Sequence, residues 1–64
     1  MIQQAQLKDV KKGEFFRFKN DESAPLWVRD YYERSEKKFC VYAYDDVNRF
    51  LLRKGSVTVF IEIY

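Results

Sequence analysis

The chain has 64 residues, of which 47% are hydrophobic and 34% are charged. This length and composition are typical of one small globular domain spanning residues 1–64, and they exclude multi-domain and large-cleft enzymes. Twelve Lys and Arg residues stand against ten Asp and Glu residues, a net charge of +2 that does not by itself identify a partner.

Several kinds of chemistry lack the residues they need. The sequence has no His and a single Cys, Cys40, so Cys and His zinc sites and His-activated nucleophiles cannot be built within one chain. Two glycines are too few for a phosphate-cradling loop. We therefore expect no enzyme, no metal and no cofactor. The lone Cys40 favours a reducing cytoplasmic compartment, and we expect no membrane span and no secretory leader.

The first third of the chain predicts a turn, a strand and a loop. Apolar residues three apart predict one turn of 3₁₀ or α helix in Leu7–Lys12. The alternating segment Gly13–Lys19 predicts a strand with Phe16 and Phe18 on one face. The polar stretch Asn20–Ser23, followed by the only proline, predicts a loop.

Two aromatic-rich runs in the middle of the chain predict a β-hairpin. The first run covers roughly Leu26–Glu33 and the second covers Lys38–Tyr44, and both are rich in strand formers. The polar segment 34–37 separates them. We expect the two strands to pair antiparallel.

The last third of the chain predicts a short helical turn near residues 45–54 and then a strand. Asp45 or Asp46 would cap the turn, a use of adjacent carboxylates that we favour over cation binding because no loop supplies the spacing of a calcium site. Gly55 would end the turn. The segment Ser56–Tyr64 alternates Val and Ile with other residues and is the clearest strand of the sequence.

These elements predict an all-β or mainly β fold. A flat sheet with one brief helix would leave one face wet, yet several predicted strands carry large apolar groups on both faces. Strongly twisted strands that curl resolve this conflict. We predict a small, strongly bent antiparallel sheet or an SH3-like barrel of four to five strands. The alternative is a sheet covered by a single helix.

Three stretches of the chain form a recognisable pattern. They are Leu7-x-Asp9-Val10-x-x-Gly13-Glu14-Phe15-Phe16, Tyr32-x-Arg34-Ser35-x-Lys37-Lys38-Phe39 and Tyr44-Asp45-Asp46-Val47-Asn48. The pattern spans most of the chain and resembles small, uncharacterised bacterial proteins of similar length that are often carried on mobile elements. The resemblance implies a free-standing bacterial cytoplasmic protein and no particular activity.

Alternation also predicts a candidate binding surface. We expect an interior lined by Phe16, Val28, Val41, Val59 and Ile61. The opposite face would then mix aromatic rings with arginines, and its members would be Phe15, Arg17, Trp27, Arg29, Tyr31, Tyr42, Tyr44 and Phe60. Bases stack on rings at about 1–3 kcal/mol each and cations neutralise phosphates, so such a face is typical of single-stranded DNA or RNA binding.

The predicted nucleic-acid-binding residues combine this face with lysines of the hairpin turn. They are Arg17, Trp27, Arg29, Tyr31, Lys37, Lys38, Tyr42 and Tyr44. Basic residues in the predicted turns could add a phosphate-contacting rim, and these are Lys8, Lys11, Lys12, Lys37, Lys38, Arg53 and Lys54. The rings also have a purely structural explanation, because cross-strand aromatic pairs stabilise small sheets.

The competing hypothesis is a protein-interaction or self-associating adaptor domain. A Trp and Tyr surface and open strand edges suit a peptide or a second copy equally well. The last strand ends at Tyr64, so it could lie at a sheet edge and form a homodimer.

Overall fold

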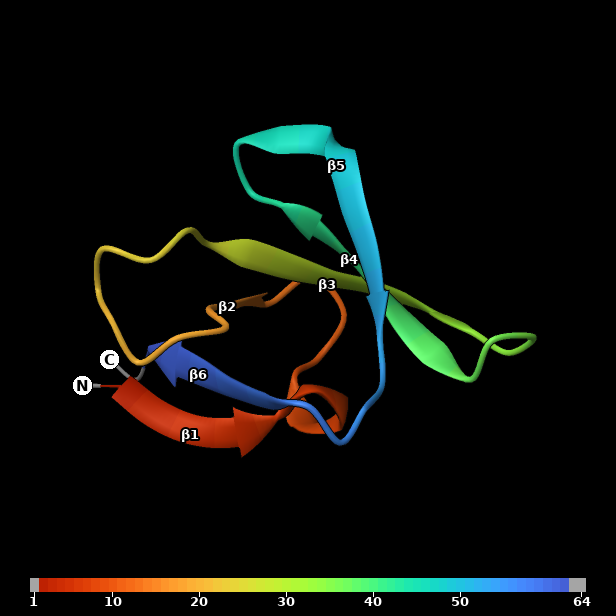
Figure 1. Cartoon of the computed structure of the whole chain (residues 1–64), viewed down its shortest axis with the longest axis horizontal. Helices are drawn as coiled ribbons and strands as arrows, with labels where there is room; N and C mark the ends of the chain where they lie inside the picture. The colour runs from red at the N-terminus through yellow and green to blue at the C-terminus, as the bar shows by residue number, and fades with distance from the viewer. Residues whose placement is uncertain (1, 63–64) are drawn as a thin grey trace.

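The computed structural model describes residues 2–62, and this part of the chain is mainly β, as the sequence predicts (Figure 1). In chain order its elements are β1 (Ile2–Gln6), the 3₁₀ turn η1 (Leu7–Asp9), β2 (Phe15–Phe16), β3 (Trp27–Glu33), β4 (Lys38–Ala43), β5 (Asp46–Arg53) and β6 (Thr58–Glu62). No helix within residues 2–62 has the length and hydropathy needed to cross a membrane.

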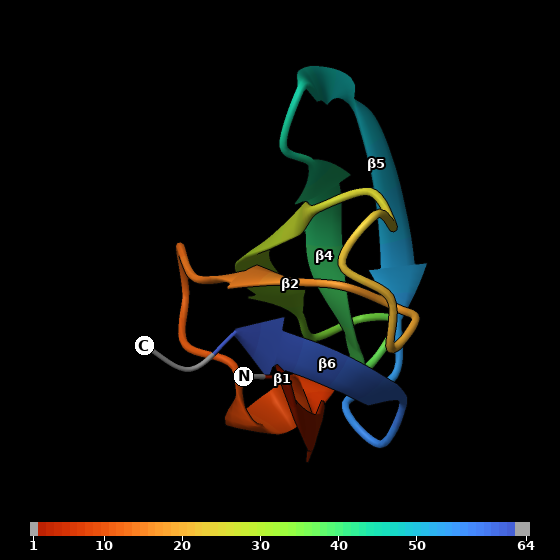
Figure 2. The ribbon, with the colours of Figure 1, turned by 90° about the vertical axis from the view of Figure 1, so that its left-hand side faces the viewer.

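The strands form two antiparallel sheets that lie across one another. One sheet pairs β1 with β6, and the other has the order β2-β3-β4-β5. A bridge between Arg17 and Phe60 joins them, with reciprocal backbone hydrogen bonds of 2.8 Å. Figure 2 shows β6 running across β4 and β5 and alongside β2. The result is a strongly bent sheet that is not closed into a barrel, because β1 and β5 end the two sheets without pairing to each other.

The core lies between the two sheets and is sealed at one end by η1. Strand register explains why side chains of distant segments meet there. Phe16 is opposite Trp27, and Trp27 is opposite Ala43, so all three face the same side of the four-stranded sheet. The buried core consists of Leu7, Val10, Phe16, Trp27, Val41, Ala43 and Val59. Each large side chain of this set stabilises the fold by about 1.5–3 kcal/mol through burial.

Most elements confirm the sequence-based prediction. The structure contains the turn at Leu7, the strand with Phe16, the hairpin around residues 34–37 and the final strand. The last two residues of the predicted strand, Ile63 and Tyr64, lie outside the described residues. The chain has six strands in residues 2–62 rather than four to five, because β1 and β5 were not predicted.

The predicted helical turn near residues 45–54 is wrong. This segment forms the edge strand β5, which pairs with β4 through Leu51 opposite Val41 and Phe50 opposite Tyr42. Pairing with a neighbouring strand outweighs the weak local helix preference. The Asp46 carboxylate does accept a backbone N–H bond, from Asn48 at 3.1 Å. It forms this local bond in a kinked strand, where the register shifts between Tyr42 and Ala43.

The last strand lies at the edge of its sheet, as the sequence predicts. β6 pairs with β1 on one side, and on the other side it has only the isolated bridge to Arg17. A homodimer formed by this strand stays a prediction. β5 is an edge of the four-stranded sheet.

Candidate functional site

The predicted face of rings and arginines is divided between two sides of the four-stranded sheet. Trp27 was predicted to point outward, but it is 8% exposed and belongs to the core. Its ring contacts the Phe18 ring at a centroid distance of 5.5 Å. Val28 is also buried, but on the opposite side, between Phe15 and Tyr42 on the neighbouring strands. Both faces of β3 bury apolar groups, and for this reason alternation alone did not identify the inner face.

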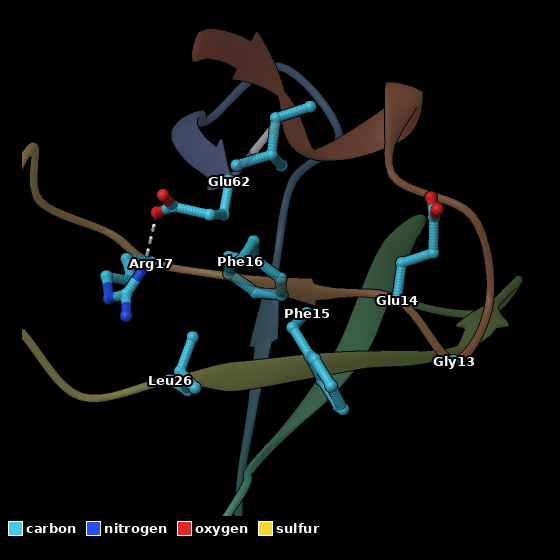
Figure 3. A pocket seen from close by; sticks show the side chains of 8 residues that line it. Gly13, Glu14, Phe15, Phe16, Arg17, Leu26 and Glu62 are labelled. Carbon is cyan, nitrogen blue, oxygen red and sulfur yellow. Dashed lines mark hydrogen bonds and ion pairs between the residues drawn. The ribbon is translucent and has the colours of Figure 1, made fainter. Parts of the chain in front are cut away.

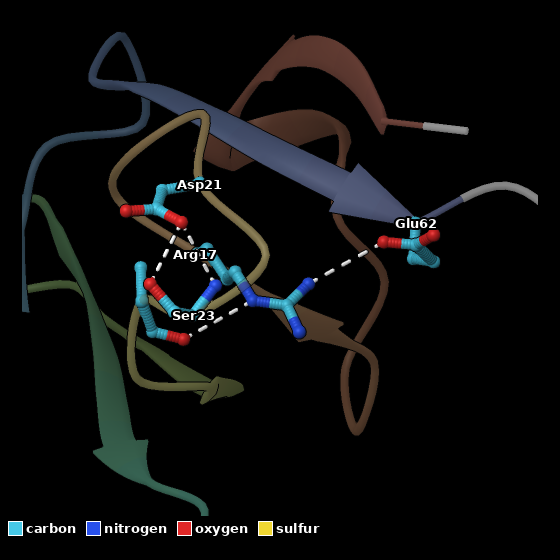
Figure 4. A network of polar contacts seen from close by, with 5 residues as sticks. Arg17, Asp21, Ser23 and Glu62 are labelled. Carbon is cyan, nitrogen blue, oxygen red and sulfur yellow. Dashed lines mark hydrogen bonds and ion pairs between the residues drawn. The ribbon is translucent and has the colours of Figure 1, made fainter.

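Arg17 is held in place by the fold rather than presented to a ligand (Figure 4). Its Nε donates to the Ala24 carbonyl at 3.1 Å, and its Nη1 lies 3.5 Å from the Glu62 carboxylate. In the same loop the Ser23 backbone N–H and hydroxyl donate to the Asp21 carboxylate at 2.9 and 2.8 Å. These bonds lower the pKa of Asp21 below its ordinary value of 3.8. Arg17 therefore ties the loop to β6.

A pocket of about 450 Å³ adjoins Arg17 (Figure 3). Phe16 and Leu26 contribute its apolar lining, and Glu14 and Glu62 contribute carboxylates. The only cation among the lining residues is Arg17, which is engaged as described above. The pocket therefore offers apolar surface without an available cation for a phosphate group.

The tyrosines of the predicted site do come together, on what we call the outer face. This is the side of the four-stranded sheet that points away from β1 and β6. One row of paired residues crosses it from β2 to β5, namely Phe15, Val28, Tyr42 and Phe50. Tyr44 joins this row, with its ring 5.1 Å from that of Phe15 in an edge contact. The outer face therefore gathers rings but not Arg17 or Arg29.

A hollow in the outer face lies over Cys40. It is lined by Asp30, Tyr31, Cys40, Tyr42, Val47 and Phe50. The side chains of Tyr31 and Cys40 both line this hollow. Burial raises the pKa of the Cys40 thiol, and the negative charge of an ionised Cys40 raises the pKa of the Tyr31 hydroxyl. Cys40 is 5% exposed, so it remains a protonated, shielded thiol at neutral pH.

A different set of residues combines rings with positive charge, and we call it the basic cluster. Its members are Lys8, Arg29, Tyr32, Phe39 and Arg53. Tyr32, Phe39 and Arg53 form one row across β3, β4 and β5. The Arg29 guanidinium carbon lies 4.4 Å from the centre of the Phe39 ring, and the Tyr32 ring centre lies 4.8 Å from that of Phe39. Lys8 enters from η1, where its backbone N–H donates to the Gly55 carbonyl at 3.0 Å.

The positive charges of the basic cluster are not neutralised by neighbours. Within residues 2–62 no carboxylate forms an ion pair with Lys8, Arg29 or Arg53. The Nε of Arg29 is buried and has no hydrogen-bond partner among the described residues. A buried N–H group without a hydrogen-bond acceptor destabilises the folded state unless an acceptor is supplied. The Arg53 Nη1 donates to the Leu52 carbonyl at 2.8 Å, which fixes one end of that guanidinium.

The residues predicted from the sequence and the basic cluster overlap in part, and the predicted site stays a prediction. It included Arg29, and it placed Lys8 and Arg53 in a basic rim, but it missed Tyr32 and Phe39. The hairpin register could have found this pair, because residues 32 and 39 are equidistant from the polar turn. Lys37 and Lys38 lie at the end of the hairpin, next to Phe39. Lys38 is opposite Glu33, and Lys37 is exposed in a left-handed turn conformation.

Comparisons with known proteins leave the chain without an assigned family. No family model, curated protein or solved structure matches it. The similarity to bacterial mobile-element proteins therefore stays a prediction. Within residues 2–62, no group of three or more His, Cys, Asp or Glu residues is placed to hold a metal ion.

Proposed function

We propose that the protein is a small non-enzymatic module that binds single-stranded nucleic acid through the basic cluster. One observation carries this proposal: the Arg29 guanidinium lies 4.4 Å over the Phe39 ring beside the exposed Tyr32, with its Nε unpartnered among residues 2–62. Rings beside uncompensated cations supply both contacts that a nucleotide chain needs, stacking for bases and charge for phosphates.

Each member of the cluster has a distinct role in this proposal. Tyr32 is 44% exposed and offers its ring to a base, a contact that contributes about 1–3 kcal/mol. Arg53 and Lys8 flank the rings and contact phosphates. Arg29 lies deeper, and its guanidinium N–H groups donate to an anionic oxygen of the ligand. Phe39 is half-buried and orients both neighbours through its ring.

The outer face is less suited to this function. Among residues 2–62, arginines lie over the rings of Phe39 and Trp27 but over none of the exposed rings of this face. Asp30 lines its hollow, and Glu33 and Lys38 lie opposite each other. Phosphate groups would find no net positive charge there. Nucleic acid is therefore proposed for the basic cluster alone.

The test is a titration of fluorescently labelled oligothymidylate and oligouridylate with the whole chain, followed by anisotropy at low salt. We expect binding that weakens as salt rises, with a log–log slope of about −2 if three phosphates are neutralised. Tyr32→Ala should weaken binding by roughly 5- to 100-fold through the lost stacking contact. Arg53→Gln should weaken it and reduce the salt slope by about 0.7.

Tyr44→Ala is the matched control, because Tyr44 is a comparably exposed strand-end ring on the outer face. It should leave the affinity unchanged. The proposal is refuted if neither oligonucleotide binds at low salt, or if Tyr44→Ala weakens binding as much as Tyr32→Ala does. Far-UV circular dichroism of each variant verifies that the fold is retained.

A further inference from the structure

The outer face is an apolar sheet surface that none of the described elements covers. An antiparallel sheet with one wet face normally alternates apolar with polar residues. Here the wet side carries rings instead, with Phe15 51%, Tyr44 57% and Phe50 63% exposed. Exposed apolar patches of this kind mark interaction surfaces more often than ordinary solvent-facing surface.

The outer face carries both an exposed pair of rings and a hollow. The rings of Phe15 and Tyr44 pack against each other in an edge contact, and both are more than half exposed. The same face holds the hollow over Cys40, with a volume of about 210 Å³ and walls that include Tyr31, Val47 and Phe50. A two-fold axis between the ring pair and the hollow would bring each ring pair onto the hollow of the other copy. In such an isologous contact every interaction occurs twice.

We propose that the outer face is the interface between two copies of this chain, with the Phe15 and Tyr44 rings of each copy seated in the hollow of the other. The exposed apolar area of the outer face is large enough for an interface between two copies. Four half-exposed rings, those of Phe15, Tyr31, Tyr44 and Phe50, leave on the order of 400 Å² per copy. With the flanking Val47 and Leu52, two copies bury on the order of 1,000 Å², the lower limit for a specific interface.

The charges of the outer face do not strongly oppose a second copy. Glu33 and Lys38 lie opposite each other on adjacent strands, which leaves Asp30 as the main uncompensated charge of the outer face. Two such faces therefore meet without strong repulsion, whereas two basic clusters would repel each other. The basic clusters lie on the other side of each sheet and stay open in the dimer. Dimerisation is thus independent of the proposed nucleic-acid binding.

Sedimentation over a concentration series tests this proposal. From about 1 μM to about 1 mM, a range that brackets interfaces of this size, we expect the mass to rise from the monomer value of 7.8 kDa to twice that value. Tyr44→Lys and Phe50→Lys should each raise the dissociation constant at least tenfold. Both side chains are exposed, so the monomer should keep its fold, and circular dichroism verifies this.

Tyr32→Lys is the matched control, because it places the same charge on an exposed ring of the opposite side and should leave the dimer intact. A chain that stays monomeric throughout the series overturns the proposal. So does a dimer that tolerates both outer-face lysines. A partner protein that binds a monomeric chain through Tyr44 and Phe50 also overturns it, since the face would then serve a different occupant.

Discussion

Gly55→Ala should destabilise the protein by steric overlap at the base of the basic cluster. A Cβ at this position would lie 2.9 Å from Phe39 Cε2 and 3.1 Å from Lys8 Cβ. Neither neighbour can retreat easily. The Phe39 ring is flanked by Tyr32 and Arg29, and Lys8 is fixed by its backbone bond to the Gly55 carbonyl.

The expected cost is that of overpacking, about 1–3 kcal/mol. A chain of this length has a total free energy of unfolding of about 3–10 kcal/mol, so the loss is a large fraction of it. Each kcal/mol lowers the melting temperature by about 4–8 °C in a domain of this size. The loss should be visible in urea titrations followed by the fluorescence of Trp27, with an unchanged slope and a lower midpoint.

A double-mutant cycle identifies the cause. In a Phe39→Leu background the smaller side chain leaves room for the new methyl group, so Gly55→Ala should cost less than half of what it costs in the natural sequence. Gly13→Ala is the contrasting variant, because Gly13 has φ of 89° and nothing within 4 Å of an added Cβ. Its cost of about 1–2 kcal/mol comes from backbone strain and should not depend on Phe39. A neutral Gly55→Ala, or a cost that Phe39→Leu leaves unchanged, would refute the steric reasoning.

Three further outcomes are expected. Phe16→Ala should cost about 3–5 kcal/mol because Phe16 is buried in the core, whereas Phe15→Ala on the same strand should cost about 1 kcal/mol, as urea titration would show. The pKa of Asp21 is lowered in the folded state, so the ionised carboxylate stabilises the fold above pH 3.8 and this stabilisation is lost as the pH falls through the folded pKa. The melting temperature of Asp21→Asn should therefore lack this part of the decrease at acid pH. Lys37 has φ of 55°, so Lys37→Gly should raise stability by up to about 1 kcal/mol in the same urea assay, and a loss would contradict this.

The elements that the sequence predicted correctly are those whose signal is local. The hairpin of β3 and β4 follows from two aromatic runs around a polar break, and β6 follows from strict alternation of Val and Ile. β1 has no such signal, since Ile2–Gln6 is rich in Gln. It becomes a strand because β6 offers an edge, with Ala5 opposite Val59. The pairing of β1 with β6 joins segments from opposite ends of the chain, so the five residues of β1 alone do not predict it.

The errors at Trp27 and in β5 have one physical origin. Trp27 and Val28 are both buried, on opposite sides of β3, so the alternation of that strand fits either orientation. In β5 the spacing of Val47, Phe50 and Leu51 resembles a helix, but it reflects a kinked strand with two of these side chains exposed. In both places the register with a neighbouring strand decides the face, and register is a property of the assembled sheet.

We expected a barrel because the strands carry apolar residues on both faces, and both faces then need to be covered. The open sheet covers only one of them. β1, β6 and η1 cover the inner face of the four-stranded sheet, while the outer row from Phe15 to Phe50 has no cover within residues 2–62. A barrel would have needed β1 to reach β5, and both lie at the far ends of the linked sheets. A second copy would supply the missing layer at the cost of association. The stability of this protein should then depend on its concentration, because a dimer interface stabilises the folded state by mass action.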